Sequence, residues 1–292
     1  MFPVSFLLCY YPGSNLSMTF ANRYLNLWER RVGRVERSVV PVRGSRSYEG
    51  AAVFVAGAGG GIGRQTAITL SESGARVACL DLDRESVEET LAQLPGDGVA
   101  LTGDITKLDS LSQFLNDAED ALGPLTALAN LVAVLKRVSV TDVTEDLWDT
   151  HLDVNAKASF FLGREFAERL RARNATGAVV FTASQSWWTG GLDGSVVYGA
   201  SKGALVSLTR GLARHYGPAG IRFNVVAPGF VDTAMLHSGL DDGAMERMIS
   251  AVPLGRLADP AEVADAIAYL MSPASSYVTG ATLVVSGGQL MY

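Results

Sequence analysis

The chain has 292 residues, of which 48% are hydrophobic and 18% charged, which suits one large α/β domain. No apolar run is long enough to span a membrane, so we expect no membrane partner. Seven arginines and two glutamates lie in residues 1–48, which leaves 17 basic and 28 acidic residues and a net charge of -11 for the remainder. That charge would repel nucleic acid.

Residues 1–48 show no sustained helical or strand periodicity, and we expect a poorly ordered N-terminal extension. Its arginines and serines would also suit a mitochondrial presequence, whereas a secretory signal has its basic residues before the apolar stretch. An over-long start, with Met18 as the initiator, is a further alternative. We expect one folded domain to span residues 49–292.

From residue 51 onward, short apolar β-rich runs alternate with longer amphipathic segments. Strands are predicted at Ala51–Ala56, Arg76–Leu80, Val99–Leu101, Ala127–Leu131, Ala178–Thr182, Arg222–Val226 and Thr282–Val285. Helices are predicted at Ile62–Ser73, Leu108–Leu122, Leu147–Arg173, Val197–Tyr216 and Pro260–Leu270. This alternation predicts an α/β fold: a Rossmann-type, doubly wound parallel sheet of about seven strands with helices on both faces, in a single domain.

The first predicted strand ends in a glycine-rich loop from Gly57 to Gly63, and a helix follows directly. Glycines let the backbone turn tightly and approach a pyrophosphate, while free N–H groups at the helix start stabilise its charge. A glycine-rich turn alone could be a tight connection, but the order of strand, loop and helix indicates a dinucleotide site.

The second predicted strand is followed by Asp81, 24 residues after Gly57. A carboxylate there accepts hydrogen bonds from the adenosine ribose hydroxyls and repels a 2′-phosphate, which favours NAD over NADP. The nearby Arg64 and Arg84 leave NADP open as an alternative. A solvated turn with an N-cap for the next helix would also explain Asp81 and Asp83.

Tyr198 and Lys202 lie four residues apart at the start of a predicted helix, so that their side chains share a face. A lysine cation and an oxidised nicotinamide both favour phenolate, which makes Tyr198 a credible acid/base. Ser184 follows a buried strand at the sheet edge where α/β proteins bind ligands, and its hydroxyl could hold a substrate oxygen. Ser186 is the local alternative.

These motifs together resemble the short-chain dehydrogenase/reductase family, from about Tyr48 to the C-terminus. The residues that match family motifs are Gly57, Gly61, Ile62 and Gly63 of the phosphate loop, Asp81, the adenine-side Asp104 and Ile105, Asn130, the tetrad of Asn155, Ser184, Tyr198 and Lys202, the nicotinamide-side Pro228, Gly229, Val231 and Thr233, and the closing Ser286-Gly287-Gly288. The resemblance implies an NAD-dependent oxidoreductase that interconverts a secondary alcohol and a ketone by hydride transfer.

By the same resemblance, Tyr198 exchanges the proton of the substrate hydroxyl and Ser184 holds the oxygen. Lys202 binds the nicotinamide ribose and lowers the pKa of Tyr198, and Asn155 anchors a relay water. The glycine loop, Asp81, the other motif residues, Tyr198 and Lys202 bind the cofactor. The family further suggests a homotetramer. No metal is expected, because the three histidines and Cys9 and Cys79 lack ligand spacing, and the cysteines suggest a reducing, cytoplasmic location.

Two stretches depart from the family pattern. The segment Ala129–Val132 has larger residues where the family has small ones, which would alter the cofactor floor. The step from Ser184 to Tyr198 is one residue longer than the commonest spacing, so we expect an inserted loop, around Trp187 to Gly194, that borders the substrate. The stretch from Met235 to Met248 is expected to form a lid over the substrate.

Two other functions remain open at this stage. A carrier-linked 3-oxoacyl reductase would have the same fold but should have basic, NADPH-selecting residues, which the glycine loop lacks. A catalytically weak dinucleotide-binding or regulatory protein would be consistent with the altered segment Ala129–Val132. Intact Tyr198 and Lys202 argue against that reading.

Overall fold

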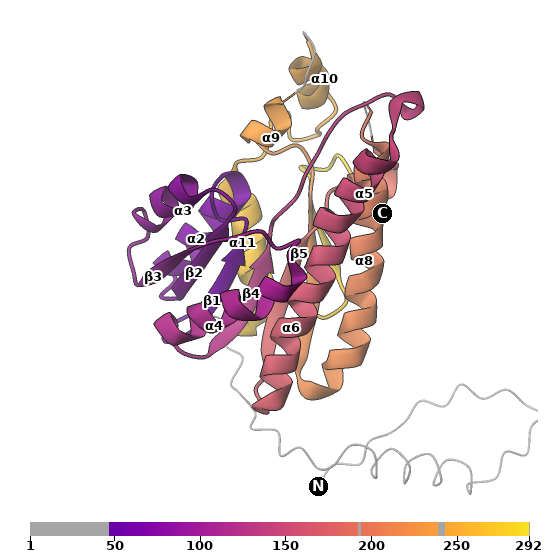
Figure 1. The fold of residues 1–292 in the computed structure, drawn as a ribbon. Helices are drawn as coiled ribbons and strands as arrows, with labels where there is room; N and C mark the ends of the chain where they lie inside the picture. Colours follow the sequence, from indigo (N-terminus) through magenta and orange to yellow (C-terminus); the bar gives the residue numbers. More distant parts are fainter. Residues whose placement is uncertain (1–46, 192–193, 239–242, 292) are drawn as a thin grey trace, which may run out of the picture. The chain divides into compact units, whose positions relative to one another are not determined.

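The computed structural model describes residues 47–191, 194–238 and 243–291, so the predicted extension lies outside the described residues except for Ser47 and Tyr48. The strands of the described part are β1 Ala52–Ala56, β2 Arg76–Asp81, β3 Gly98–Thr102, β4 Leu125–Asn130, β5 Gly177–Thr182, β6 Ile221–Pro228 and β7 Thr282–Val285. They form one parallel sheet in the order β3-β2-β1-β4-β5-β6-β7, which confirms the predicted seven-stranded sheet. Figure 1 labels β3, β2, β1, β4 and β5 of this order.

Helices cover both faces of the sheet, as predicted. In the described ranges the α-helices are α2 Gly61–Glu72, α3 Arg84–Leu91, α4 Leu111–Leu122, α5 Glu145–Leu152, α6 Ser159–Ala172, α7 Ser186–Thr189, α8 Val196–Tyr216, α9 Ala234–His237, α10 Ala244–Ser250 and α11 Pro260–Met271. Shorter turns are η1 Leu108–Ser110, η2 Val140–Asp142, the π-helical η3 Asp153–Ala158, η4 Gly217–Ala219 and η5 Pro273–Ser275.

The strands are apolar throughout because both faces of the sheet are covered. Along β1, Phe54 packs on the face that contacts α4, α6 and α8, whereas Val53 and Val55 pack on the face that contacts α2 and α11. Successive strand residues point to opposite faces, so a strand buried on both sides has no polar alternation. All five residues of β1 are fully buried.

The strand order places a crevice at the carboxyl edge of the sheet. From β1 the chain runs outward to β2 and β3, and it then returns to the other side of β1 as β4. The connections after β1 and β4 therefore diverge, which leaves room for a ligand beyond the ends of these two strands. The Gly57 N–H donates to the Leu80 carbonyl at 2.8 Å, which ties the glycine loop to the end of β2.

The prediction of one continuous α-helix from Leu147 to Arg173 is wrong. A π-helical turn, η3, separates α5 from α6, and Asn155 lies within it. The Asn155 side chain is engaged with the backbone of Val134, accepting its N–H at 2.8 Å and donating to its carbonyl at 3.0 Å. π-Helical turns have one residue more than an α-helical turn would need and are frequent at functional sites.

Tyr48 is buried among α11 residues, and its hydroxyl donates to the Ala268 carbonyl, so ordered packing begins before residue 49. Within the described ranges no helix is long and apolar enough to cross a bilayer. In the same ranges, no group of three or more His, Cys, Asp or Glu side chains could hold a metal ion.

Candidate active site

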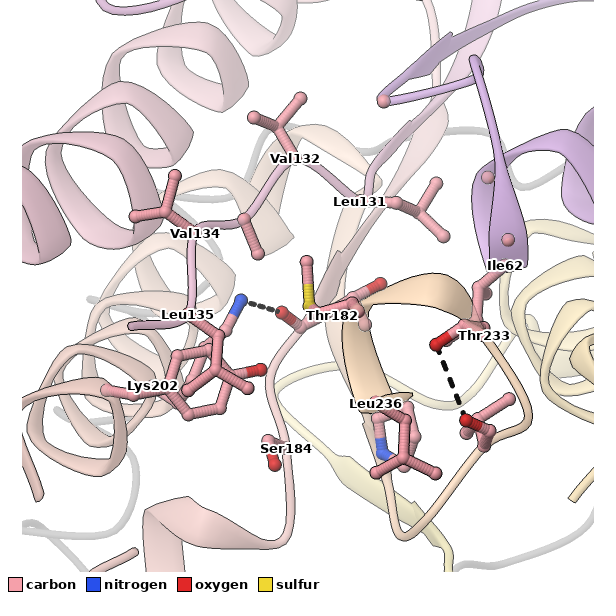
Figure 2. A pocket seen from close by; sticks show the side chains of 18 of the residues that line it. Ile62, Leu131, Val132, Val134, Leu135, Thr182, Ser184, Lys202, Thr233 and Leu236 are labelled. Atoms are coloured by element: carbon pink, nitrogen blue, oxygen red, sulfur yellow. Dashed lines mark hydrogen bonds between the residues drawn. The ribbon is translucent and has the colours of Figure 1, made fainter. Parts of the chain in front are cut away.

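A cavity of about 660 Å³ lies along the carboxyl edge of the sheet, lined by the connections that follow β1 to β6. Of the residues predicted from sequence, the cavity brings together Gly57, Gly61, Ile62, Gly63, Asp81, Asp104, Ile105, Ser184, Tyr198, Lys202, Pro228, Gly229, Val231 and Thr233. Figure 2 shows this lining, with Ser184 and Lys202 in one part and Ile62 and Thr233 in another. Asn130 and Asn155 do not line it, and neither do Ser286, Gly287 and Gly288 of the closing motif.

The glycine loop is shaped so that side chains would not fit. Gly57 has a positive φ of 82°, and a Cβ there would lie 2.8 Å from the Val132 nitrogen. A Cβ at Gly63 would lie only 1.8 Å from the Gly57 carbonyl oxygen. The first turn of α2 contains no acidic side chain, so its positive end faces the cavity without a competing charge. The loop therefore fits a pyrophosphate group.

Asp81 is fixed by backbone donors at the end of β2. Its Oδ2 accepts the Gly59 N–H at 2.7 Å, and its Oδ1 accepts the Leu82 N–H at 2.7 Å and the Asp83 N–H at 3.3 Å. Asp83 is the N-cap of α3, where its side chain accepts the Glu85 N–H. The turn reading thus applies to both aspartates, and Asp81 in addition lines the cavity.

The two arginines that left NADP open are both paired with carboxylates. Arg64 contacts Glu89 at 2.9 Å, and Arg84 contacts Glu88 at 2.7 Å. The residue directly after Asp81 is Leu82, whose exposed fraction is 71%. The surroundings of Asp81 thus offer a 2′-phosphate little uncompensated positive charge.

Tyr198, Lys202 and Ser184 meet at the junction of β5 and α8. Both α8 side chains are buried, Lys202 with an exposed fraction of 1%. The Lys202 Nζ donates to the Thr182 carbonyl at 2.7 Å and lies 5.5 Å from the centre of the Tyr198 ring. Ser184 and its neighbour Ser186 both line the cavity with Tyr198, and Ser184 is near enough to Tyr198 to lower the pKa of its hydroxyl. The Ser184 Oγ also donates to the Ser186 Oγ at 3.2 Å.

Burial controls the protonation of this group. It raises the pKa of Tyr198 to about 12, against the opposing effects of the Ser184 hydrogen bond and the charge of Arg137. Burial also lowers the pKa of Lys202 to about 7. The expected lowering of the Tyr198 pKa by Lys202 is therefore weakened, because burial disfavours the lysine cation as well.

Asn155 does not line the cavity but holds the start of α8 in position through hydrogen bonds. Its Nδ2 donates to the Ser201 Oγ at 2.9 Å, and that hydroxyl donates to the Tyr198 carbonyl at 2.7 Å. Together with its two bonds to Val134, this network connects the chain after β4 to the first turns of α8. Asn155 thus acts on Tyr198 through its backbone, a long-range role that helix periodicity alone does not reveal.

Asn130 has a similar bracing role at the end of β4. It is buried, donates to the Ser159 Oγ at 2.9 Å and accepts the Val132 N–H at 3.1 Å. The departures Leu131 and Val132 do line the cavity, so the floor differs from the family pattern as expected. Asp104 accepts the Thr106 N–H at 2.8 Å and so fixes the turn after β3.

The predicted inserted loop and lid each contribute to the cavity wall in part. Ser186 and Thr189 of α7 line it, whereas the tryptophan pair does not: Trp187 packs against the core and Trp188 is exposed. From the lid, the lining residues are Met235, Leu236 and Met248. Residues 192–193 and 239–242 of these segments lie outside the described residues.

Sequence analysis missed the residues contributed by the chain after β4. Val134, Leu135 and Arg137 line the cavity, and Arg137 is close enough to act electrostatically on Tyr198. The available signal was a cation within an otherwise apolar run that follows a strand at the ligand-binding edge.

Comparisons with known proteins agree with this architecture. The family profile described as enoyl-(acyl carrier protein) reductase matches residues 57–289. The (3R)-3-hydroxyacyl-CoA dehydrogenase of Canis lupus familiaris is 32% identical, over 82% of this chain and 96% of that protein. Galactitol 2-dehydrogenase (L-tagatose-forming) of Cereibacter sphaeroides is 33% identical, over 84% of this chain and 96% of that protein.

A solved structure matches over nearly its full length. The crystal structure of a dehydrogenase/reductase from Sinorhizobium meliloti 1021 superimposes with a TM-score of 0.76 at 31% identity, covering 85% of this chain and 98% of that one. Sequence, fold and cavity therefore agree: the chain belongs to the short-chain dehydrogenase/reductase family, and it is an NAD(P)-dependent oxidoreductase that acts on CH–OH groups or the corresponding ketones.

Proposed function

We propose that the chain is an NAD-dependent dehydrogenase that interconverts a secondary alcohol and a ketone, with Tyr198 as the general acid/base. The observation that carries the proposal is that Ser184, Tyr198 and Lys202 line one cavity, with the Lys202 Nζ 5.5 Å from the centre of the Tyr198 ring. Asp81 is the last residue of β2 and Ser184 follows β5. These two strands lie three strand spacings apart, or about 14 Å. An extended dinucleotide can span that distance between its adenosine ribose and its nicotinamide.

The chemistry divides between cofactor and protein. When bound, NAD supplies the hydride acceptor. The Ser184 hydroxyl and the Tyr198 phenolate hold the substrate hydroxyl, and Tyr198 takes its proton as the carbonyl forms. In its ammonium form, Lys202 favours the phenolate that accepts this proton. Asn155 keeps Tyr198 in position through Ser201, as a positioning residue rather than a group that touches the substrate.

The proposed cofactor contacts follow the cavity. Gly57, Gly61, Ile62 and Gly63 would hold the pyrophosphate, Asp81 the adenosine ribose, Asp104 and Ile105 the adenine side, and Lys202, Pro228, Gly229, Val231 and Thr233 the nicotinamide half. NAD is proposed over NADP because the Asp81 carboxylate faces the ribose position and the nearby Arg64 and Arg84 are paired with glutamates. Asn130 is assigned an indirect role through the turn it fixes.

One observation favours the alternative of an acyl-group reductase that uses NADPH. A relative is named (3R)-3-hydroxyacyl-CoA dehydrogenase, so a thioester-linked substrate belongs in any screen. The negative charge of Asp81 and the pairing of the nearby arginines argue against NADPH.

We also propose a homo-oligomer in the cytoplasm, with the groove lined by Phe160, Arg164 and Leu208, among others, at a subunit interface. Light scattering that shows only monomer at micromolar concentration would contradict the oligomer.

The test is NADH formation, followed by absorbance, across a panel of secondary alcohols, sugars, hydroxy acids and a 3-hydroxyacyl thioester. The wild-type protein is compared with Tyr198→Phe and with the control Tyr216→Phe. Tyr216 lies on the same helix and donates to Glu168 at 2.8 Å, but it does not line the cavity. Turnover should be lost in Tyr198→Phe and kept in Tyr216→Phe. If NADP is preferred, the cofactor assignment is wrong, and if Tyr198→Phe stays active, the acid/base assignment is wrong.

A further inference from the structure

The segment of residues 133–138, here called the strap, crosses the cavity wall between β4 and η2. Alternate residues of the strap are fixed through their backbone: Val134 by Asn155, Lys136 by the Nε2 of His151 at 3.2 Å, and Val138 by the Gly194 carbonyl at 3.0 Å. Because alternate residues are fixed, the side chains between them have a defined direction.

Those intervening side chains line the cavity. Leu135 and Arg137 are lining residues, whereas the Lys136 side chain is exposed and does not line it. His151 is buried, and its Nδ1 lies 2.8 Å from the Leu147 carbonyl. The neutral tautomer with its proton on Nδ1 satisfies both contacts, since Nε2 then accepts the Lys136 N–H. The strap therefore holds Arg137 in place on a rigid support.

Arg137 has donors to spare. Its Nη1 donates to the Ser238 carbonyl, and among the residues that the structure describes no carboxylate pairs with it. A guanidinium has five N–H donors in a planar fork that matches a carboxylate. The half-buried Arg137 is also near enough to Tyr198 for its charge to lower the tyrosine pKa against the effect of burial.

Part of the cavity wall is apolar. The strap, η3 and the stretch from Met235 to Met248 contribute the lining side chains Val134, Leu135, Val154, Met235, Leu236 and Met248. A cation in such a wall is stabilised by an opposite charge. The two acidic residues among the described lining are Asp81, which ends β2, and Asp104, which follows β3, at the other end of the strand order from Tyr198.

We infer that Arg137 binds an anionic group of the substrate, so that the preferred substrates are hydroxy acids and the corresponding oxo acids. Their carboxylate pairs with Arg137, and their alkyl chain contacts the apolar wall. This inference rests on the proposed function, which places the reacting carbinol at Ser184 and Tyr198. Oxidation then removes a hydride to NAD and a proton to Tyr198, while the carboxylate stays unchanged.

The experiment compares kcat/KM for 3-hydroxy acids with that for their primary amides, in the wild type, Arg137→Met and the control Lys136→Met. Arg137→Met removes a charge-assisted hydrogen-bonded pair with the acid. The kcat/KM of the acid relative to that of the amide should therefore fall by about 10- to 100-fold, mainly because the KM of the acid rises. Lys136→Met, which removes a neighbouring cation outside the cavity, should keep the wild-type ratio. Equal losses of kcat/KM for acid and amide would overturn the inference. They would indicate that Arg137 only positions the chain at Ser238 or acts on Tyr198.

A binding arm separates this inference from the proposed function. Calorimetry in the presence of NADH measures the binding of an alkyl carboxylate, its primary amide and an alkyl phosphate to the wild type, Arg137→Met and Lys136→Met. Carboxylate binding that depends on Arg137, and not on Lys136, supports the inference even if the alcohol panel shows no turnover. Tighter binding of the alkyl phosphate would replace hydroxy acids with phosphate esters. Equal binding of carboxylate and amide would refute an anion site.

Discussion

Burial of Lys202 should make the stability of the protein depend on pH when no dinucleotide is added. Its pKa falls from an ordinary value of 10.5 to about 7 in the folded chain. Below the lower value both states bind the proton, and above the upper value neither does. Between them the unfolded chain alone holds it, so the free energy of unfolding should rise with pH across this window.

The pKa values set the magnitude. Each pH unit inside the window contributes up to about 1.4 kcal/mol, so the full difference corresponds to about 5 kcal/mol. Between about pH 7.5 and about pH 9.5 we therefore expect the wild type to gain roughly 2 to 3 kcal/mol from this one group.

The assay is urea unfolding at a series of pH values for the wild type and Lys202→Met. Methionine keeps much of the buried stem but removes the charge and the bond to the Thr182 carbonyl. Tyr198 and Cys79, whose pKa values are raised by burial, are present in both proteins. Parallel stability curves for the two proteins would refute the reasoning.

Three further changes test the glycine loop, the core and a surface network. Gly63→Ala should abolish dinucleotide binding in calorimetry, because its Cβ would lie 1.8 Å from the Gly57 oxygen. Gly163→Ala should lower the free energy of urea unfolding by about 1 to 3 kcal/mol, because its Cβ would lie 2.6 Å from the Phe181 ring. Burial raises the pKa of Glu119, but the hydrogen bonds from Arg173, the Leu125 N–H and Arg169 together lower it below its ordinary value. The stability advantage of the wild type over Glu119→Gln should therefore shrink as unfolding is measured below about pH 4.

The sheet and the cofactor-side motifs could be predicted because their signals are local. Strands such as β1 are apolar along their whole length, and the loop from Gly57 to Gly63 is a contiguous pattern. Tyr198 and Lys202 are one helical turn apart, so their proximity also follows from spacing alone. All of these features depend on a few neighbouring residues rather than on the folded chain.

The strap could not be predicted in this way. The bond between Lys136 and His151 joins residues 15 apart, and Arg137 reaches Ser238 across 101 residues. Asn155 and Asn130 were assigned to the site by family position, and the structure shows them as braces whose partners come from other elements. Which polar side chains face a cavity and which support its walls depends on tertiary packing.

The π-helical turn η3 makes the packing of α5 and α6 sensitive to the deletion of a single residue. A π turn holds one residue more than an α-helical turn, so α5 and α6 are out of phase by about 100° relative to a continuous helix. Deleting one residue between Asp153 and Ala158 would restore regular winding but rotate the buried face of α6 away from the sheet, or α5 away from the strap. Single-residue deletions here should therefore be far more harmful than the substitution of an exposed residue such as Lys157.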